Sequence, residues 1–244
     1  TFDLSALTSP AVITLTALGS SDGFAGGETT SALSFQNIDQ ITGTAGSDSL
    51  TGMNGDSTWQ VTGTDAGFYT HTARTLAFDA IENWLGGTGN NALSYELLSD
   101  PVAVTLVSEG SLQGYTGTAT DLSGGFTNMN LFQGGSASDS FTGMAADATW
   151  NLNTTTIYST SASRSASLSG FEALIGGSAA DTFAIEGTHT LAGSIDGGAG
   201  SGVDRLTYQN SSSPASIVLS GLGTVSGFAG SASAISSGFD NIDV

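Results

Sequence analysis

The sequence predicts an all-β fold, a right-handed parallel β-helix (β-solenoid) with about 22 to 23 residues per coil and about eleven coils. Three observations predict it. The chain repeats itself, its two repeat lengths differ by roughly one coil, and its apolar segments are short and rich in β-branched residues. Glycine and serine interrupt every segment long enough to form a helix, which disfavours a helical solenoid.

Three prolines mark a long repeat. The phrases "SPAVITL", "DPVAVTL" and "SPASIVL" contain Pro10, Pro101 and Pro214. The second interval between prolines is longer than the first by about 22 residues, the size of one solenoid coil, and it contains a loose copy of the chain's own Gly-Gly/Asp phrase. An open stack accepts one more coil, whereas a closed propeller does not. We therefore expect one solenoid over residues 1–244, with internal repeats 35–125 and 126–238 and partial copies 1–34 and 239–244.

A shorter module recurs inside these repeats. Its copies begin at Phe35, Phe78, Phe126 and Leu168, and a truncated copy begins at Phe239. Like apolar residues at matching positions predict a ladder of stacked side chains inside the solenoid. The interior is expected to contain Phe35, Ile38, Phe126, Met129, Phe171 and Leu174. Strands are expected in "AVITLTA", "TWQVTG", "VAVTLVS", "TWNLNT" and "SIVLSG", which are β-branched and alternating.

Each module is followed by a glycine- and aspartate-containing phrase, such as "GGSASDSF" or "GGSAADTF". Its acids are candidate calcium ligands: Asp48, Asp139, Asp181 and Asp204. Calcium takes six to eight oxygen ligands, but one copy has Asn91 in place of the acid, and no two phrases are nine residues apart. We favour a structural corner in which glycine provides a positive φ and the acid caps the turn. No cofactor is expected, and calcium binding is the alternative.

Aromatic residues and histidines offer other candidate sites. Trp59 and Trp150 occupy the same position in two copies of the long repeat. Together with Tyr115 they are candidates for a glycan-binding platform, although stacked core positions are the favoured interpretation. His71 and His189 each lie in a Thr-His-Thr triplet without a recurring acidic partner, and we expect both to face solvent. No pattern of catalytic residues recurs, so we expect no enzyme activity.

Charge excludes several classes of partner. The chain has 22 acidic residues and three basic ones, no lysine, no cysteine and a formal net charge of −19. Nucleic-acid binding needs Lys and Arg for phosphate contacts, and anionic membrane surfaces repel such a chain. No apolar run approaches the roughly 20 residues that span a bilayer, so membrane insertion is not expected.

Both ends of the sequence lie inside repeats. Residues 1–4 align with residues 92–95, and residue 244 falls six residues into a new module. We therefore expect a piece of a longer chain whose end faces are covered by further repeats or by self-association.

The "GG-x-x-x-D-x-F" corners and the Phe-x-x-Ile-Asp/Glu phrases resemble repeat regions of giant bacterial surface adhesins, of the filamentous haemagglutinin-like and RTX types. The resemblance implies an extracellular, cell-surface location and a non-catalytic structural or adhesive role, as a stiff stalk or contact surface. Surface glycans and host or neighbouring cell surfaces are the implied partners. The alternatives are a glycan-binding or polysaccharide-degrading β-helix and a calcium-stiffened RTX-type module.

Overall fold

The protein is a β-solenoid. The computed structural model describes residues 1–160 and 164–244. In these residues 53% lie in strands and none in a helix, and parallel coils stack in about five turns. The predicted all-β, repetitive solenoid is confirmed at this level. The prediction of about eleven coils is not supported.

The chain divides into two compact units. Unit 1 comprises residues 1–99 and 108–133, and unit 2 comprises residues 100–107 and 134–244. The strands of unit 1 are β1 (Phe2–Asp3), β2 (Val12–Leu18), β3 (Phe24–Glu28), β4 (Leu33–Ile38), β5 (Gln40–Thr42), β6 (Ser49–Thr51), β7 (Ser57–Gly63), β8 (Ala66–His71), β9 (Arg74–Asp79), β10 (Asn83–Leu85), β11 (Asn91–Ser94), β13 (Tyr115–Ala119), β14 (Leu122–Met129) and β15 (Leu131–Gln133). The strands of unit 2 are β12 (Ala103–Glu109), which begins in it, β16 (Ser140–Thr142), β17 (Ala148–Leu152), β18 (Thr156–Ser159), β19 (Ser165–Ser169), β20 (Ala173–Ile175), β21 (Asp181–Ile185), β22 (Ser194–Asp196), β23 (Arg205–Thr207), β24 (Ile217–Leu222), β25 (Phe228–Ala232) and β26 (Ile235–Ile242).

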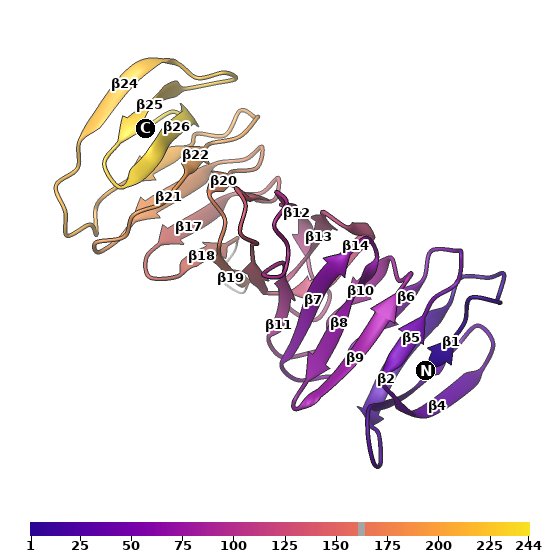
Figure 1. Cartoon of the computed structure of the whole chain (residues 1–244). Coiled ribbons are helices and arrows are strands. Elements are labelled where there is room, and N and C mark those ends of the chain that lie inside the picture. The colour runs from indigo at the N-terminus through magenta and orange to yellow at the C-terminus, as the bar shows by residue number, and fades with distance from the viewer. Residues whose placement is uncertain (161–163) are drawn as a thin grey trace. The chain divides into compact units, whose positions relative to one another are not determined.

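Each unit contains two sheets, and the chain passes from one to the other and back. The sheets of unit 1 have the orders β1-β5-β9-β8-β7-β11-β15 and β13-β14-β10-β6-β2-β3-β4. Those of unit 2 are β19-β18-β17-β21-β23 and β24-β25-β26-β22-β20-β16-β12. Short single strands pair in parallel, for example β6 with β10. At intervals a three-stranded antiparallel meander replaces a single strand, as with β7, β8 and β9, which lie side by side in Figure 1.

The meanders explain why the coil count was wrong. Dividing each repeat into coils of one length assumes that all coils are equal, but a meander such as β7–β9 keeps the whole of residues 57–79 within one sheet. The prediction that the longer repeat contains additional solenoid structure agrees with the strand order. In unit 1, β14 pairs directly with β10, whereas in unit 2 β22 lies between β20 and β26. The extra stretch supplies β22 and β23, one strand for each sheet.

The core lies between the two sheets of each unit. Phe35, Phe126, Met129, Phe171 and Leu174 are buried as predicted, and only Ile38 of the predicted set is half-exposed. Alternation along the strands produces this core, because in β7 every second side chain is buried. Removing these side chains from water is the main stabilising contribution.

Every copy of the module bends through a left-handed residue at its third position. These residues, with φ between 53° and 70°, are Asn37, Ala80, Asn128, Gly170 and Asn241. Asn and Gly tolerate this conformation better than other residues. The side chain of Asn128 also joins chain segments, because its Oδ1 accepts from the Leu112 amide at 3.0 Å and its Nδ2 donates to the Gly86 carbonyl at 3.0 Å. The recurrence of Asn and Gly was a signal that the sequence interpretation did not use.

Candidate functional site

The buried aspartates are corner caps. Asp139 Oδ2 accepts from the Gly135 amide at 2.5 Å, and its Oδ1 accepts from the Val102 amide at 2.9 Å. Asp48 accepts in the same way from the Thr44 amide and, at 2.6 Å, from the Ala11 amide. Each carboxylate therefore holds its own turn and a neighbouring strand, as the structural-corner interpretation predicted.

The first glycine of the corner has a different role from the one expected. Gly43, Gly86, Gly134 and Gly176 are absent from the glycines with positive φ. A Cβ built on Gly134 would instead overlap the carbonyl oxygen of Gly170, which belongs to the next module copy. The predicted positive φ occurs at other corner glycines, Gly89 (100°) and Gly198 (101°). Glycine is required at the first position because an adjacent coil approaches the backbone too closely for a side chain.

A second row of acids and amides joins successive corners. Glu82 Oε2 accepts from the amide of Asp48 at 2.6 Å, and Glu172 Oε2 accepts from the amide of Asp139 at 2.9 Å. The pattern continues where Asn130 caps Asn91, Asp204 caps Asp181 and Asp243 caps Asp204. The sequence did not lead us to expect the bond between Glu82 and the corner at Asp48.

The four candidate calcium ligands do not form a shared site. Asp48 and Asp139 lie in separate corners of different units, while Asp181 and Asp204 meet through the Asp181 amide, which donates to Asp204 Oδ1 at 2.9 Å. All four side chains are buried. Within residues 1–160 and 164–244, no group of three or more His, Cys, Asp or Glu side chains could hold a metal ion.

The three candidate glycan-binding aromatics are inaccessible. Trp59, Trp150 and Tyr115 are each 0% exposed, so the proposal that they form an external sugar platform is wrong. Trp150 packs against Tyr158 and Phe183, with ring centroids 4.6 and 5.3 Å away. Burial follows from alternation, because these rings lie on the inward-facing positions of β7, β13 and β17.

The two equivalent tryptophans differ in hydrogen bonding. Trp150 Nε1 donates to Asp181 Oδ1 at 3.2 Å. In the other copy Asn91 replaces the acid, and its Oδ1 accepts from the Ser57 hydroxyl at 2.7 Å. Trp59 Nε1 is consequently buried without a partner among the described residues.

Burial raises the pKa of the corner acid Asp181. Desolvation raises the pKa of Asp181 to about 7, and the nearby Asp204 and Asp147 carboxylates add to the effect. The Gly177 amide and the Trp150 indole oppose it by hydrogen bonding. Desolvation also raises the pKa values of Asp204 and Glu82. Burial therefore favours the protonated forms of Asp181, Asp204 and Glu82.

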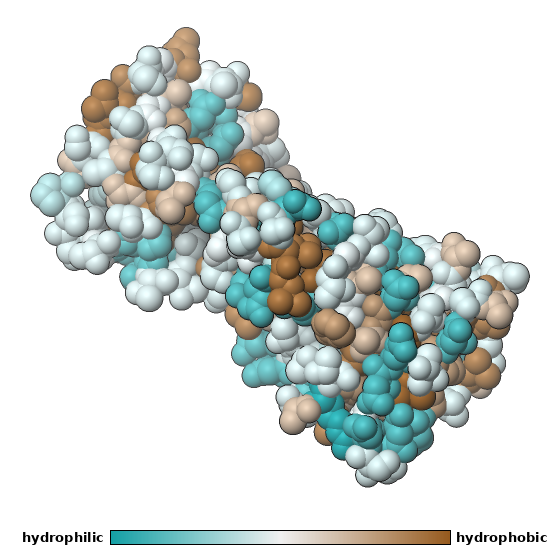
Figure 2. All heavy atoms as spheres, in the orientation of Figure 1, coloured by the Kyte–Doolittle hydropathy of each residue, from teal (hydrophilic) through white to brown (hydrophobic). Residues whose placement is uncertain are grey.

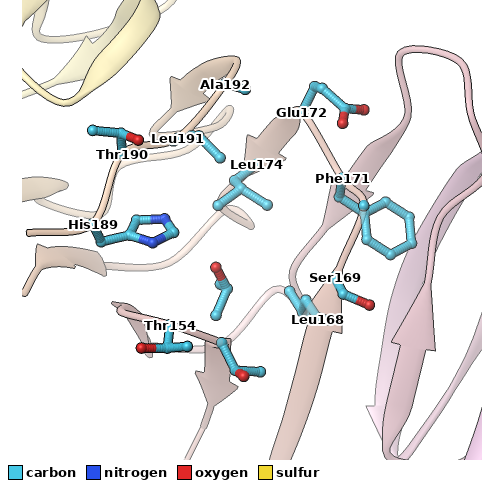
Figure 3. Close-up of a pocket in the computed structure, with 13 residues that line it drawn as sticks. Thr154, Leu168, Ser169, Phe171, Glu172, Leu174, His189, Thr190, Leu191 and Ala192 are labelled. Carbon is cyan, nitrogen blue, oxygen red and sulfur yellow. The ribbon is translucent and has the colours of Figure 1, made fainter.

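Unit 2 also contains a cavity of about 270 Å³. Figure 3 shows the His189 imidazole directed toward Leu174, while the Phe171 ring points away. His189 Nε2 has no hydrogen-bond partner in the described structure, and burial lowers the pKa of this histidine. Glu172, which also lines the cavity, is engaged by the Asp139 amide. The cavity therefore presents a neutral imidazole beside leucine side chains.

The prediction that both histidines face solvent is wrong for His71 and is not confirmed for His189. His71 is buried, and its ring stacks on Tyr69 with centroids 6.4 Å apart. Its Nδ1 lies 3.0 Å from the Asp56 carbonyl oxygen. His71 therefore does not face solvent, whereas His189 is half-buried.

Comparisons of the chain with protein-family models, curated proteins and solved structures find no match. In the part of the chain that the structure describes, no helix is long and apolar enough to cross a membrane. The fold and its repeated corners define the protein as a β-solenoid repeat protein.

Proposed function

We propose that the chain is a non-catalytic structural and adhesive segment of a long bacterial cell-surface or extracellular filament protein. It acts as a stiff repeat stalk or as a contact surface. The finer prediction of right-handed winding belongs to this proposal, since parallel crossovers are right-handed in about 98% of cases.

One observation carries the proposal: the recurring acids are occupied in joining coils to one another. The corner Asp139 binds two backbone amides, and its own amide is capped by Glu172 from the next coil. Residues that recur at fixed spacing thus serve the stacking of repeats. Such a chain gains extent by adding coils, because each coil is stabilised by its nearest neighbours. The resemblance to adhesin repeats supports the proposed location.

The proposal is tested by pulling single chains from both ends. We expect discrete high-force unfolding steps, because stacked parallel strands must be separated together. Smooth extension at low force would contradict the proposed role as a stiff stalk. The same protein should release neither reducing ends nor unsaturated uronates from a panel of acidic polysaccharides. Such release would favour the alternative of a polysaccharide-degrading β-helix.

A further inference from the structure

An open groove lies on the outer face of one sheet of unit 1. Its volume is about 720 Å³, within the range of about 300–1,000 Å³ that is usual for ligand sites. Thr58 of β7, Ala92 of β11 and Leu131 of β15 lie side by side in it, because Ala92 pairs with both of the others. All three point away from the core, since the residue that follows each of them is buried. The small side chain of Ala92 between two larger ones leaves this part of the face hollow.

Polar side chains around the groove hold their own turns with one atom and leave a second atom unbonded. Asp56 Oδ1 accepts from the Asn90 amide at 2.8 Å, and Asn54 Oδ1 accepts from the Thr88 amide at 3.0 Å. Asn90 Oδ1 accepts from Asn130 Nδ2 at 3.1 Å. Among the described residues, no protein group bonds to Asp56 Oδ2, Asn54 Nδ2 or Asn90 Nδ2. The groove therefore offers one carboxylate acceptor and two amide donors.

His71 adds a second acceptor, and its ring is held firmly. The residue is only 8% exposed, and its ring stacks on Tyr69. Its Nδ1 lies 3.0 Å from the Asp56 carbonyl oxygen, so the proton of the neutral ring is on Nδ1 and is donated to that oxygen. The lone pair of Nε2 has no protein partner within the described part of the chain, yet this atom is accessible to solvent. A buried ring that lines a groove and has one accessible, unbonded nitrogen is suited to a ligand hydroxyl that donates to it.

These groups match an uncharged ligand that is rich in hydroxyls. A hydroxyl both donates and accepts, so it bonds equally well to an imidazole or carboxylate acceptor and to an amide donor. The half-buried Ala92 and Leu131 suit the C–H groups of a sugar ring. The described residues that line the groove include no Lys or Arg, and the Asp56 carboxylate repels an anion. In Figure 2, hydrophilic and hydrophobic atoms lie side by side over the strands β7, β8 and β9 of Figure 1.

We propose that this groove binds a neutral carbohydrate. Asp56 and His71 accept hydrogen bonds from the sugar hydroxyls, the two asparagine amides donate to them, and Ala92 and Leu131 contact the ring. An extended peptide is a poorer match, because β8 and β11 already occupy both edges of β7 and leave no strand edge for main-chain pairing. The inference rests on the proposed adhesive role and names the chemical class of its partner.

The test uses the full chain and five probes: neutral oligosaccharides of glucose, mannose, galactose and N-acetylglucosamine, and an acidic oligogalacturonate. Calorimetry should show saturable binding of at least one neutral probe, with the same Kd at low and high salt. Oligogalacturonate should not bind. The ¹⁵N chemical shift of His71 Nε2 should move on binding, which locates the site in the unaltered chain.

Two kinds of variant test the groove itself. Ala92→Phe should abolish binding by filling the hollow. Ala77→Phe is the matched control, since Ala77 is a half-buried alanine on the outer face of the same sheet but outside the groove. Asp56→Asn keeps an oxygen for the Asn90 amide and replaces the unbonded acceptor by a donor, so affinity should fall about tenfold.

Failure of all four neutral probes to bind would overturn the proposal. So would an unmoved His71 signal, equal binding by Ala92→Phe and Ala77→Phe, or tighter binding of oligogalacturonate that weakens with salt. The pulling experiment measures stiffness and needs no ligand in the groove. Failure of carbohydrate binding with discrete unfolding steps would therefore reject this site alone, whereas smooth extension would reject the stalk role whatever the groove binds.

Discussion

At the scale of single residues, equivalent positions of the repeat perform the same task with different chemistry. Asp181 accepts the Trp150 indole N–H. Asn91 instead accepts the Ser57 hydroxyl, and its Nδ2 donates to the Gly87 carbonyl at 2.8 Å. An amide can thus replace a corner acid where a carbonyl, rather than an amide N–H, faces the side chain.

Because only Trp150 of the two has a hydrogen-bond partner for its indole N–H among the described residues, replacing the two tryptophans should lower the free energy of unfolding by different amounts. Trp150→Phe removes a hydrogen bond to the Asp181 side chain, whereas Trp59→Phe removes a buried donor without a partner. We expect Trp150→Phe to lower the free energy of unfolding by about 1–2 kcal/mol more. Urea denaturation, with hydrogen exchange resolving the two units, measures both. In a Ser57→Ala background Asn91 Oδ1 becomes available to Trp59, so the difference should shrink. Equal costs in both backgrounds would contradict this assignment.

The raised pKa of Asp181 predicts how stability changes with pH. An aspartate ionises near pH 3.8 when unfolded but near 7 in the folded protein. Between these values the folded state binds the proton and the unfolded state does not. The contribution of Asp181 to stability is thus complete below about pH 4 and is lost as pH rises through about 7, with a slope of at most about 1.4 kcal/mol per pH unit. Asp181→Asn should therefore gain stability relative to wild type over this interval. Asp100→Asn, an exposed acid with the same charge change, is the control, and an identical pH profile for both variants would refute the assignment.

At the scale of elements, corners and strands depend on close approach between coils. The first glycine of the corner has a neighbouring carbonyl where a side chain would lie, as at Gly134 beneath Gly170. The corner acid Asp139 accepts a hydrogen bond from the amide of Gly135, the residue after this glycine. Backbone packing therefore sets the spacing of the Gly and Asp positions that the sequence repeats.

Adding one methyl group tests that close contact. Gly134→Ala should lower the free energy of unfolding by about 1–3 kcal/mol, because the new Cβ overlaps the Gly170 carbonyl oxygen. Gly63→Ala is the matched control, since a Cβ there has nothing within 4 Å. That change should be neutral or slightly stabilising. Thermal unfolding of the two variants makes the comparison, and similar losses at both sites would show that close approach is not the reason for the glycine.

The sequence predicted strands and interior more successfully than connections between strands. Phe126 and Met129 were found because like residues recur at inward positions. The meanders were missed because an alternating strand has the same pattern whether its neighbours are parallel or antiparallel. Three of their tight turns use Asp65, Thr72 and Asp121 at positive φ, so these turns lack the Asn-Gly or Asp-Gly dipeptide that normally indicates a hairpin.

At the scale of the whole molecule, acidic residues greatly outnumber basic ones. The corner carboxylates are nevertheless engaged by backbone amides rather than by cations. The net charge is −19, and the half-buried Arg74 lies 4.0 Å from the exposed Asp22 in an ion pair. Repulsion among surface acids opposes the compact state and is screened by salt. The corner carboxylates, in contrast, are already bonded to backbone amides. A divalent cation is therefore attracted by the negative surface, but at the corners it would have to replace backbone amides that already bind the carboxylates.

Calcium should therefore act through ionic strength alone. We expect EDTA to leave the far-UV circular dichroism unchanged, because binding calcium at a corner would displace amide donors such as Gly135 from Asp139. Added calcium chloride should raise the unfolding temperature only as much as magnesium chloride at the same ionic strength. Specific binding to the folded state at 100 times its Kd would instead add about 2.7 kcal/mol. Asp139→Asn is the variant control, since it should leave the response to either salt unaltered. Loss of the β signal on chelation and its recovery with calcium, or a calcium response that Asp139→Asn abolishes, would favour the calcium-stiffened RTX-type alternative.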